Sequence, residues 1–513
     1  MRRSLGVLVV LVWIGLVGWQ VRWEYFQPEL TRLTRAATAL DPGTYFYSVA
    51  MQGEVVGISS SRLDTVPEGF RIDDMVTLEL HSMGRPESAV ARTRVTLNPA
   101  LQMEDFSFSL TSGAGDFSAE GTVEGDSLLQ VRINNQAGSD ELSFRVGDTP
   151  TFAAALPIRL AMGGDLEVGR TFRFPVFDPS TVSLRTVEIE VLGRDTLMLP
   201  DSAVAESGTG RWLPGETRPT EAWHLREQVG GVSVESWIDQ DGRIIRSSSP
   251  IGFSLERTPY QLAVQAQNDR RIALRGGAMP GDLVYSTAIG SNLDLGDATN
   301  RDELRFVLTG VDLDGFDLEG GGQELRGDTL VVRRPTWSDI DPGYELPYPR
   351  MDLRVALEAE PLIQSGDPRI TEAARRAVGG RSGRSDPRFV AERLTRAVYG
   401  MLEKEVSLSV PSATQVLESG SGDCNEHTVL YVAMARSLGL PARIAVGLVY
   451  LDGTFLYHAW PEVWLDDWVP VDPTLGQIPA DAAHLRFVTG GLARQLEIAR
   501  LVGSLEIEVL EGQ

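Results

Sequence analysis

The sequence predicts an α+β protein in which an N-terminal transmembrane helix precedes antiparallel β-rich domains and a C-terminal domain with helices before a sheet. Three observations predict this order. An apolar run spans 5–19, alternating apolar and polar residues recur through the first half of the chain, and helix-spaced apolar residues appear after 367. With 513 residues and 42% hydrophobic composition, the chain is long enough for several cores. We divide it into residues 1–26, 27–275, 276–349 and 350–513.

The N-terminal run has the features of a membrane anchor. Arg2 and Arg3 precede it, and its length falls between a signal-peptide core and a comfortable membrane span. No small-x-small cleavage pattern follows it, whereas Trp19, Trp23 and Tyr25 suit a membrane interface. We therefore expect an uncleaved signal anchor, rather than a cleaved signal peptide, with a single pass through the cell membrane. The arginines place the N-terminus in the cytoplasm and the bulk of the chain outside, in the periplasm.

The charge and the cysteine count exclude several classes of function. The chain has 47 basic and 71 acidic residues, for a formal net charge of -24. This charge argues against nucleic acid as a partner and against docking of the soluble part on anionic lipid. Cys424 is the only cysteine, so no intrachain disulfide can form. Lys404 is the only lysine, so the protein offers almost no amine for cross-linking to itself.

The region 27–275 is predicted to be β-rich. Apolar and polar residues alternate in 106–110, 187–191 and 232–237. The last of these segments runs into Asp241-Gly242 and a pair of isoleucines, a pattern typical of a β-hairpin. The recurrence of such segments favours a sandwich or a curved sheet.

A smaller β unit is predicted for 282–334, after a break rich in proline and glycine. Residues 304–308 and 330–332 are its strand candidates. The proline-rich segment 335–349 is typical of a linker. At the other end of the chain, residues 505–509 alternate cleanly and are expected to add an edge strand.

Helices are predicted to resume after the linker. Asp367 and Asp386 each precede a proline, which pairs a capping residue with a favourable first helical residue. They mark the starts of helices at 369–378 and 388–402. A third helix is predicted for 425–438, where apolar residues recur at helical spacing.

Cys424 directly precedes this third helix, in the run Gly-Asp-Cys-Asn-Glu-His at 422–427. A thiol attacks a carbonyl only as the thiolate, and its free pKa of about 8.5 has to be lowered for that. The unpaired N–H groups and the dipole of a helix N-terminus favour a negative charge, and a neighbouring imidazolium does the same. We therefore expect the pKa of Cys424 to lie below the free value.

His458 and Asp472 follow on a predicted β-hairpin. Side chains alternate between the faces of a strand, so the length of the connecting loop decides whether the two residues share a face. A two-residue turn at 466–467 would direct Asp472 away from His458. A three-residue loop at 465–467 pairs residue 464 with 468 and residue 460 with 472, and brings Asp472 within hydrogen-bond reach of His458. A Cys-His-Asp site therefore requires an odd loop or a bulge, between strands predicted at 443–450, 454–464 and 468–472.

Four runs carry a family resemblance. They are Gly-Asp-Cys-Asn-Glu-His-Thr at 422–428, Ala-Arg-Ser-Leu-Gly-Leu-Pro-Ala-Arg at 435–443, His-Ala-Trp-Pro-Glu-Val-Trp at 458–464 and Trp-Val-Pro-Val-Asp-Pro-Thr at 468–474. Together they resemble the transglutaminase-like superfamily, and more closely its bacterial, membrane-associated branch. The resemblance is strong over 417–474 and weaker outward to 367 and 488. It implies a papain-like core, in which a helix with the cysteine packs on an antiparallel sheet with the histidine and the aspartate.

The resemblance also implies a role for each member of the site. Cys424 is the expected nucleophile, His458 the general base and acid, and Asp472 the group that orients the imidazole. The backbone N–H of Cys424 is one expected oxyanion donor. No position matches the second donor. The further candidates for the oxyanion site and the substrate groove are Gln415, Asp423 and Trp460.

Other interpretations of these residues were weighed against the catalytic one. A lone cysteine is usually a buried small hydrophobe, and His427 and His484 are expected to be structural. One cysteine and scattered histidines do not form the Cys or His pairs of zinc sites, so no metal is expected. No glycine-rich phosphate loop stands between a strand and a helix, and no cofactor is expected.

The implied chemistry is acyl transfer, in which a thiolate attacks an amide or ester carbonyl and water or an amine resolves the acyl-enzyme. Bacterial relatives of this type are expected to be peptidases or amidases. Hydrolysis of a peptide or protein substrate, cell-envelope material included, is therefore the first expectation. One alternative is cross-linking by a protein-glutamine transglutaminase. The other is a catalytically inactive, membrane-tethered module that binds peptide or cell wall.

Overall fold

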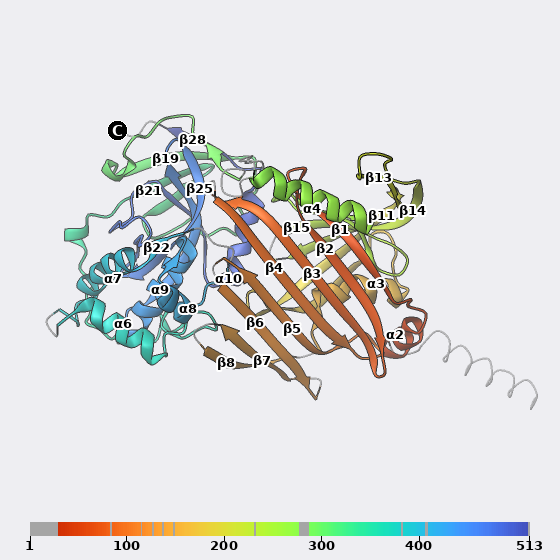
Figure 1. Ribbon diagram of the computed structural model, residues 1–513. Coiled ribbons are helices and arrows are strands. Elements are labelled where there is room, and N and C mark those ends of the chain that lie inside the picture. The colour runs from red at the N-terminus through yellow and green to blue at the C-terminus, as the bar shows by residue number, and fades with distance from the viewer. Residues whose placement is uncertain are drawn as a thin grey trace, which may run out of the picture.

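The computed structural model describes residues 29–82, 85–113, 115–125, 128–135, 138–146, 149–229, 232–275, 287–380, 383–405 and 409–510 (Figure 1). The signal anchor expected at 1–26 lies outside these residues. Within the described ranges, no helix combines the length and the apolar character that crossing a membrane requires.

One large sheet occupies the first half of the chain (Figure 1). In the described residues it has 15 strands, in the order β8-β7-β6-β5-β4-β3-β2-β1-β17-β16-β15-β14-β11-β10-β9. The strands are β1 Gly43–Met51, β2 Glu54–Val66, β3 Gly69–Ser82, β4 Arg85–Leu97, β5 Met103–Ser112, β6 Gly115–Glu124, β7 Leu128–Asn135, β8 Gly138–Arg145, β9 Thr151–Phe152, β10 Thr171–Asp178, β11 Ser183–Pro200, β14 Thr217–Val229, β15 Val232–Ile238, β16 Ile244–Ser248 and β17 Phe253–Thr258. The strands predicted at 106–110, 187–191 and 232–237 are confirmed within β5, β11 and β15.

The strands form one hydrogen-bonded path, and side chains from its two halves pack against each other. Strand β1 pairs antiparallel with β17, which joins the first and the last strand of this region. Further out, the ring of Phe106 in β5 lies 5.6 Å from that of Phe152 in β9 and 5.2 Å from that of Phe177 in β10. The two halves of the sheet therefore share one apolar core. The remaining elements of this region are the hairpin β12 Ala203–Ala205 and β13 Trp212–Pro214, and helices α2 Glu29–Ala37, α3 Leu156–Gly163 and α4 Tyr260–Arg275.

The C-terminal domain is built around a buried helix. Helix α9, Cys424–Ser437, is buried at each residue from Glu426 to Arg436. It contacts helices α6, α7 and α8 (Figure 1) and strands β23 Ser421–Gly422, β24 and β25. Its neighbours are α6 Pro368–Val378, α7 Pro387–Met401, α8 Ala413–Ser419, β24 Ala442–Leu451 and β25 Thr454–Trp464. Asp367 and Asp386 cap α6 and α7 ahead of their prolines, as predicted.

The central sheet of this domain has the order β18-β25-β24-β27, with β26 paired to β25. Its other strands are β18 Ile289–Gly290, β26 Trp468–Pro470 and β27 His484–Thr489. A second sheet, β20-β21-β19-β28, packs on it through a common apolar core. This sheet contains β19 Glu303–Thr309, β20 Gln323–Arg326, β21 Thr329–Arg333 and β28 Glu506–Leu510. The predicted tail strand is thus confirmed as β28, at the edge beside β19.

The β-rich region contacts the C-terminal domain beside the start of α9. Glu87 of β4 and Gly113 after β5 line a cavity of about 70 Å³ together with Gln415 and Gly422. Leu362 and Val410 of the C-terminal domain belong to the core of the large sheet. The minor elements here are β22 Glu403–Lys404, β23 Ser421–Gly422 and α10 Leu492–Gln495. The domain boundaries drawn from the sequence stay predictions.

Candidate active site

Cys424 is the first residue of α9, and a reciprocal cap fixes its position. The Asp423 side chain accepts a hydrogen bond from the Asn425 N–H at 2.8 Å, and the Glu426 carboxylate accepts one from the Asp423 N–H at 2.9 Å. These bonds satisfy N–H groups that have no partner within the helix. Asp423, a candidate for the substrate groove, is therefore a helix cap. The thiol stands at the helix N-terminus, as predicted.

The hairpin has the three-residue loop that the site requires. Trp464 is paired with Trp468, and Glu462 with Pro470, which leaves 465–467 as the loop. Asp466 in this loop has φ of 75°, a left-handed conformation in which aspartate costs less than most residues. The ladder ends at Pro470, so the predicted pairing of 460 with 472 does not form. Asp472 instead forms a bridge with Gln477 just beyond the strand.

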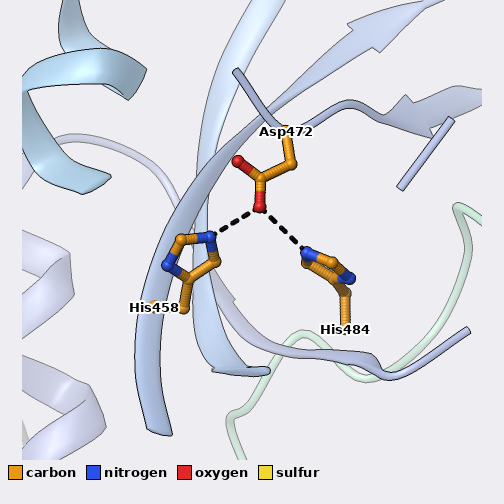
Figure 2. Close-up of side chains that lie close together, drawn as sticks. All are labelled: His458, Asp472 and His484. Atoms are coloured by element: carbon orange, nitrogen blue, oxygen red, sulfur yellow. Dashed lines mark hydrogen bonds and ion pairs between the residues drawn. The ribbon is translucent and has the colours of Figure 1, made fainter. Parts of the chain in front are cut away.

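His458 and Asp472 share a face and are hydrogen bonded, as predicted. The Nε2–H of His458 donates to Oδ2 of Asp472 at 2.7 Å (Figure 2). The backbone N–H groups of Thr474 and Leu475 donate to the other oxygen, Oδ1, at 2.7 and 2.9 Å. The carboxylate is therefore held from both oxygens, and its orientation toward His458 is set by the turn that follows the strand.

The first turn of α9 is attached to β25 at the residue after His458. The Thr428 hydroxyl donates to the Ala459 carbonyl at 3.0 Å, and the Ala459 N–H donates to the Cys424 sulfur. Nε2 of His458 is engaged by Asp472 (Figure 2), so Nδ1 is the ring nitrogen that remains for a proton from the thiol. The structure therefore joins His458 to Asp472 directly and links Cys424 to the strand of His458 through Ala459.

A fourth residue, His484, joins this site. Its Nε2 lies 3.1 Å from Oδ2 of Asp472, and its Nδ1 lies 2.9 Å from Oδ1 of Asp481 (Figure 2). We expected a structural role for His484, which lies downstream of the triad in the sequence. The pairing of β27 with β24 brings it to the site. The local pattern of an aspartate three residues before a histidine is the signal that could have found it.

Trp460 shields the histidines from solvent. It is almost fully buried, with its ring centroid 5.9 Å from that of His458 and 5.2 Å from that of His484. A low local dielectric strengthens the hydrogen bonds of the site. The predicted groove residue is therefore a buried wall of the catalytic cluster.

The site also brings together three side-chain atoms that could bind a metal ion. These atoms belong to His458, Asp472 and His484 and lie within 4.8 Å of one another. Both histidine nitrogens, however, point at the same carboxylate oxygen at hydrogen-bond distance, and Nδ1 of His484 is engaged by a second carboxylate. This geometry describes a hydrogen-bond network. The expectation that the chain uses no metal stays a prediction.

Comparison with protein families identifies the domain that carries this site. Residues 375–473 match the model of the transglutaminase-like superfamily, a stretch that contains Cys424, His458 and Asp472. The C-terminal domain belongs to the transglutaminase-like superfamily. The match ends before His484. None of the curated proteins compared with the chain matches it.

Several solved structures are similar to parts of this chain. A β-barrel-like protein of unknown function from Brucella abortus is 10% identical, with 42% of this chain and 94% of that chain covered and a TM-score of 0.29. A candidate cysteine protease from Cytophaga hutchinsonii is 15% identical, with 40% and 80% covered and a TM-score of 0.26. The periplasmic domain of TgpA from Pseudomonas aeruginosa is 20% identical, with 35% and 75% covered and a TM-score of 0.23. These scores are low, and the family assignment rests on the residues matched.

The expected low pKa of Cys424 in the transglutaminase-like site is contradicted. Burial raises the pKa of the thiol well above its ordinary value, and the carboxylates of Asp423, Glu426 and Asp472 raise it further, against the opposing effect of the Ala459 N–H. Burial is the largest cause, and the carboxylates that cap the helix act in the same direction. A raised pKa favours the neutral thiol, so attack by this sulfur would require a base that takes its proton.

Gln415, the candidate for the second oxyanion donor, is a buried residue of α8. Its Oε1 has no hydrogen-bond partner among the described residues and lies at the small cavity between the β-rich region and the start of α9. Its role at the oxyanion stays a prediction.

The charges of the transglutaminase-like site predict a loss of stability at alkaline pH. Burial alone would lower the pKa of His484, but hydrogen bonds to Asp472 and Asp481 outweigh it and raise the pKa from 6.5 to about 9. Because the pKa of His484 is higher in the folded protein than in the unfolded chain, protonation of this residue stabilises the fold. This contribution is fully present below pH 6.5 and is lost as the pH rises through about 9. This shift is worth about 3 kcal/mol of unfolding free energy. Chemical unfolding at a series of pH values should show the decline, and His484→Gln should flatten it; equal slopes in the two proteins would contradict the assignment.

Proposed function

We propose that this chain is a membrane-anchored, extracytoplasmic thiol enzyme that hydrolyses amide bonds of peptides or proteins through Cys424, His458 and Asp472. The observation that carries the proposal is the buried His458–Asp472 hydrogen bond, next to the residue whose N–H contacts the Cys424 sulfur. Membership of the transglutaminase-like superfamily supports a thiol enzyme. The anchored, periplasmic location rests on the apolar run 5–19 and the arginines before it.

The hydrogen bonds give proton transfer a direction. With Nε2–H donated to Asp472, Nδ1 of His458 carries the lone pair that accepts the thiol proton. As this proton leaves Sγ of Cys424, the sulfur attacks the carbonyl carbon and the carbonyl electron pair moves to oxygen. Burial alone would raise the pKa of Asp472, but His458 and His484 hold it well below its usual range. The ionised carboxylate then stabilises the imidazolium that forms.

The same histidine completes the reaction. The oxyanion forms at the N-terminus of α9, where backbone N–H groups favour negative charge. His458 returns the proton to the leaving amine as the carbon–nitrogen bond breaks, and a thioester remains on Cys424. Water then attacks the thioester as His458 takes its proton. Collapse of this second intermediate returns the proton to the sulfur and releases a carboxylic acid. An amine in place of water gives the transglutaminase reaction.

The experiment that tests the proposal separates these outcomes on one substrate set. Purified protein is incubated with a peptide library that contains glutamine, with and without a primary amine, and the products are read by mass spectrometry. Hydrolysis predicts gain of water at an amide bond in both conditions. Incorporation of the amine instead indicates a transglutaminase. No covalent change in any peptide indicates the inactive binding module.

Alkylation of Cys424 should report its raised pKa directly. The rate of modification by an uncharged haloacetamide is expected to rise with pH through a midpoint above about 8.5, the free-thiol value. Because Cys424 is the only cysteine, loss of free thiol measures this residue alone. A midpoint below the free value would show that an ion pair with His458 outweighs burial and the neighbouring carboxylates.

A further inference from the structure

His484 is a buried residue between two carboxylates. Both of its ring nitrogens lie at hydrogen-bond distance from a carboxylate oxygen, Nε2 at 3.1 Å from Asp472 and Nδ1 at 2.9 Å from Asp481. An ionised carboxylate only accepts hydrogen bonds, so both nitrogens have to carry a proton. The ring is therefore an imidazolium enclosed in the protein.

Packing alone does not account for this charge. A buried charge costs free energy unless it is paired, and an apolar side chain of similar size would fill the space beside Trp460. Nor is His484 needed to satisfy the first oxygen of Asp472, which already accepts two backbone N–H groups. The imidazolium binds the second oxygen, Oδ2, the atom that accepts from His458 (Figure 2). Its contact therefore acts on the catalytic hydrogen bond.

The His484 ring is also fixed on the side away from Asp472, where Asp481 contacts it. Oδ1 of Asp481 also accepts the Ala483 N–H at 3.0 Å, and Oδ2 accepts the Gln477 side-chain amide at 2.8 Å. Gln477 in turn is bridged to the backbone of Asp472. A closed set of hydrogen bonds thus runs from Gln477 through Asp481 and His484 to Asp472, which fixes each group before substrate binds.

We propose that His484 is a positioning residue for the reaction: its imidazolium holds Oδ2 of Asp472 in line with His458 and keeps that carboxylate ionised. The inference rests on the proposed function, because it gives His484 a part in the same chemistry. It adds a residue beyond the segment that matches the superfamily, 375–473. The site is then a Cys-His-Asp triad whose aspartate is shared by two histidines with different tasks.

Two substitutions separate the contact to Asp472 from the presence of a polar side chain. The amide nitrogen of glutamine reaches the position of Nε2, so His484→Gln keeps a donor to Asp472. The amide of asparagine reaches only the position of Nδ1, so His484→Asn keeps the contact to Asp481 and loses the one to Asp472. The measurement is the rate of Cys424 alkylation by an uncharged haloacetamide near neutral pH, with His458→Ala as the reference for a site without its base.

The expected result is a graded loss. His484→Asn should slow alkylation on the order of 10- to 100-fold, and His484→Gln should recover the rate to within about fivefold of the native protein. Ring nitrogen NMR of the five histidines should show one imidazolium with two N–H groups near neutral pH, absent from both variants. Asp481→Asn keeps the His484 ring and should slow alkylation about threefold to tenfold. This variant tests the same role if the His484 variants do not fold.

The outcomes distinguish this inference from the proposed function. Native alkylation rates in both His484 variants and in Asp481→Asn would overturn the positioning role. The positioning role would also be overturned if His484→Asn and His484→Gln slowed alkylation equally and in proportion to their fall in melting temperature. A residue with a purely structural role gives that pattern. A native rate in His458→Ala would instead remove the proposed function itself.

Discussion

Replacement of Cys424 by alanine is expected to abolish acyl transfer, with kcat reduced by a factor on the order of 10,000 or more. No other side chain can form the thioester, because the chain has no second cysteine. The measurement is single-turnover product formation on the substrate found by the peptide screen.

The fold is expected to survive this substitution. Cys424 is partly buried as a residue, and its thiol packs at the edge of the core around α9, so alanine removes one sulfur atom and leaves the capping bonds of Asp423 and Glu426 in place. We expect a loss below about 1.5 kcal/mol of unfolding free energy. Ser437→Ala, at the far end of the same helix, is the matched control and should keep native turnover. Native turnover in Cys424→Ala would remove the thiol mechanism.

Replacement of Asp472 by asparagine is expected to lower kcat by about two to four orders of magnitude. Asparagine can still accept the N–H groups of Thr474 and Leu475 through its oxygen, but its amide then faces the Nε2–H groups of His458 and His484. Donor meets donor, so His458 is driven to the other tautomer and Nδ1 is no longer free to accept the thiol proton. The amide also carries no charge to stabilise the imidazolium.

This variant should be less stable as well, by about 1–3 kcal/mol, because charged hydrogen bonds of a buried residue are lost. Turnover is therefore compared at a temperature where circular dichroism shows both proteins fully folded. Asp467→Asn in the neighbouring loop, where the side chain is exposed and caps the Trp468 N–H, is the matched control and should leave turnover unchanged. Activity that falls only as far as the folded fraction would contradict the orienting role of Asp472.

Local sequence rules predicted the parts of the site that depend on local geometry. Strand alternation and the odd loop 465–467 place Asp472 on the face of His458, and the helix start after Asp423 places Cys424. These rules could not predict the pKa of Cys424. The direction of the pKa shift depends first on the burial of the thiol and then on the carboxylates of Asp423 and Glu426, whose charges the sequence-based expectation did not include.

The parts that escaped prediction depend on long-range pairing. His484 reaches Asp472 because β27 pairs with β24; the local pair of Asp481 and His484 marks the histidine but does not encode this pairing. The β-rich region was expected to be a sandwich or a curved sheet, and the single sheet follows from the pairing of β1 with β17, which lie some 200 residues apart. The alternation of apolar and polar residues in β5 and β15 predicts which side chains share a face. It does not predict which segments pack on that face, as the contact of Phe106 with Phe177 shows.

If His458 makes Cys424 a nucleophile, covalent labelling of the thiol depends on that histidine. The protein is treated with a peptide-based electrophile that captures catalytic thiols, and the adduct is located by mass spectrometry in the native chain and in His458→Ala and Cys424→Ala. We expect one adduct on Cys424 in the native protein, labelling slowed at least about 100-fold in His458→Ala, and none in Cys424→Ala. Equal labelling of the native protein and His458→Ala would contradict it.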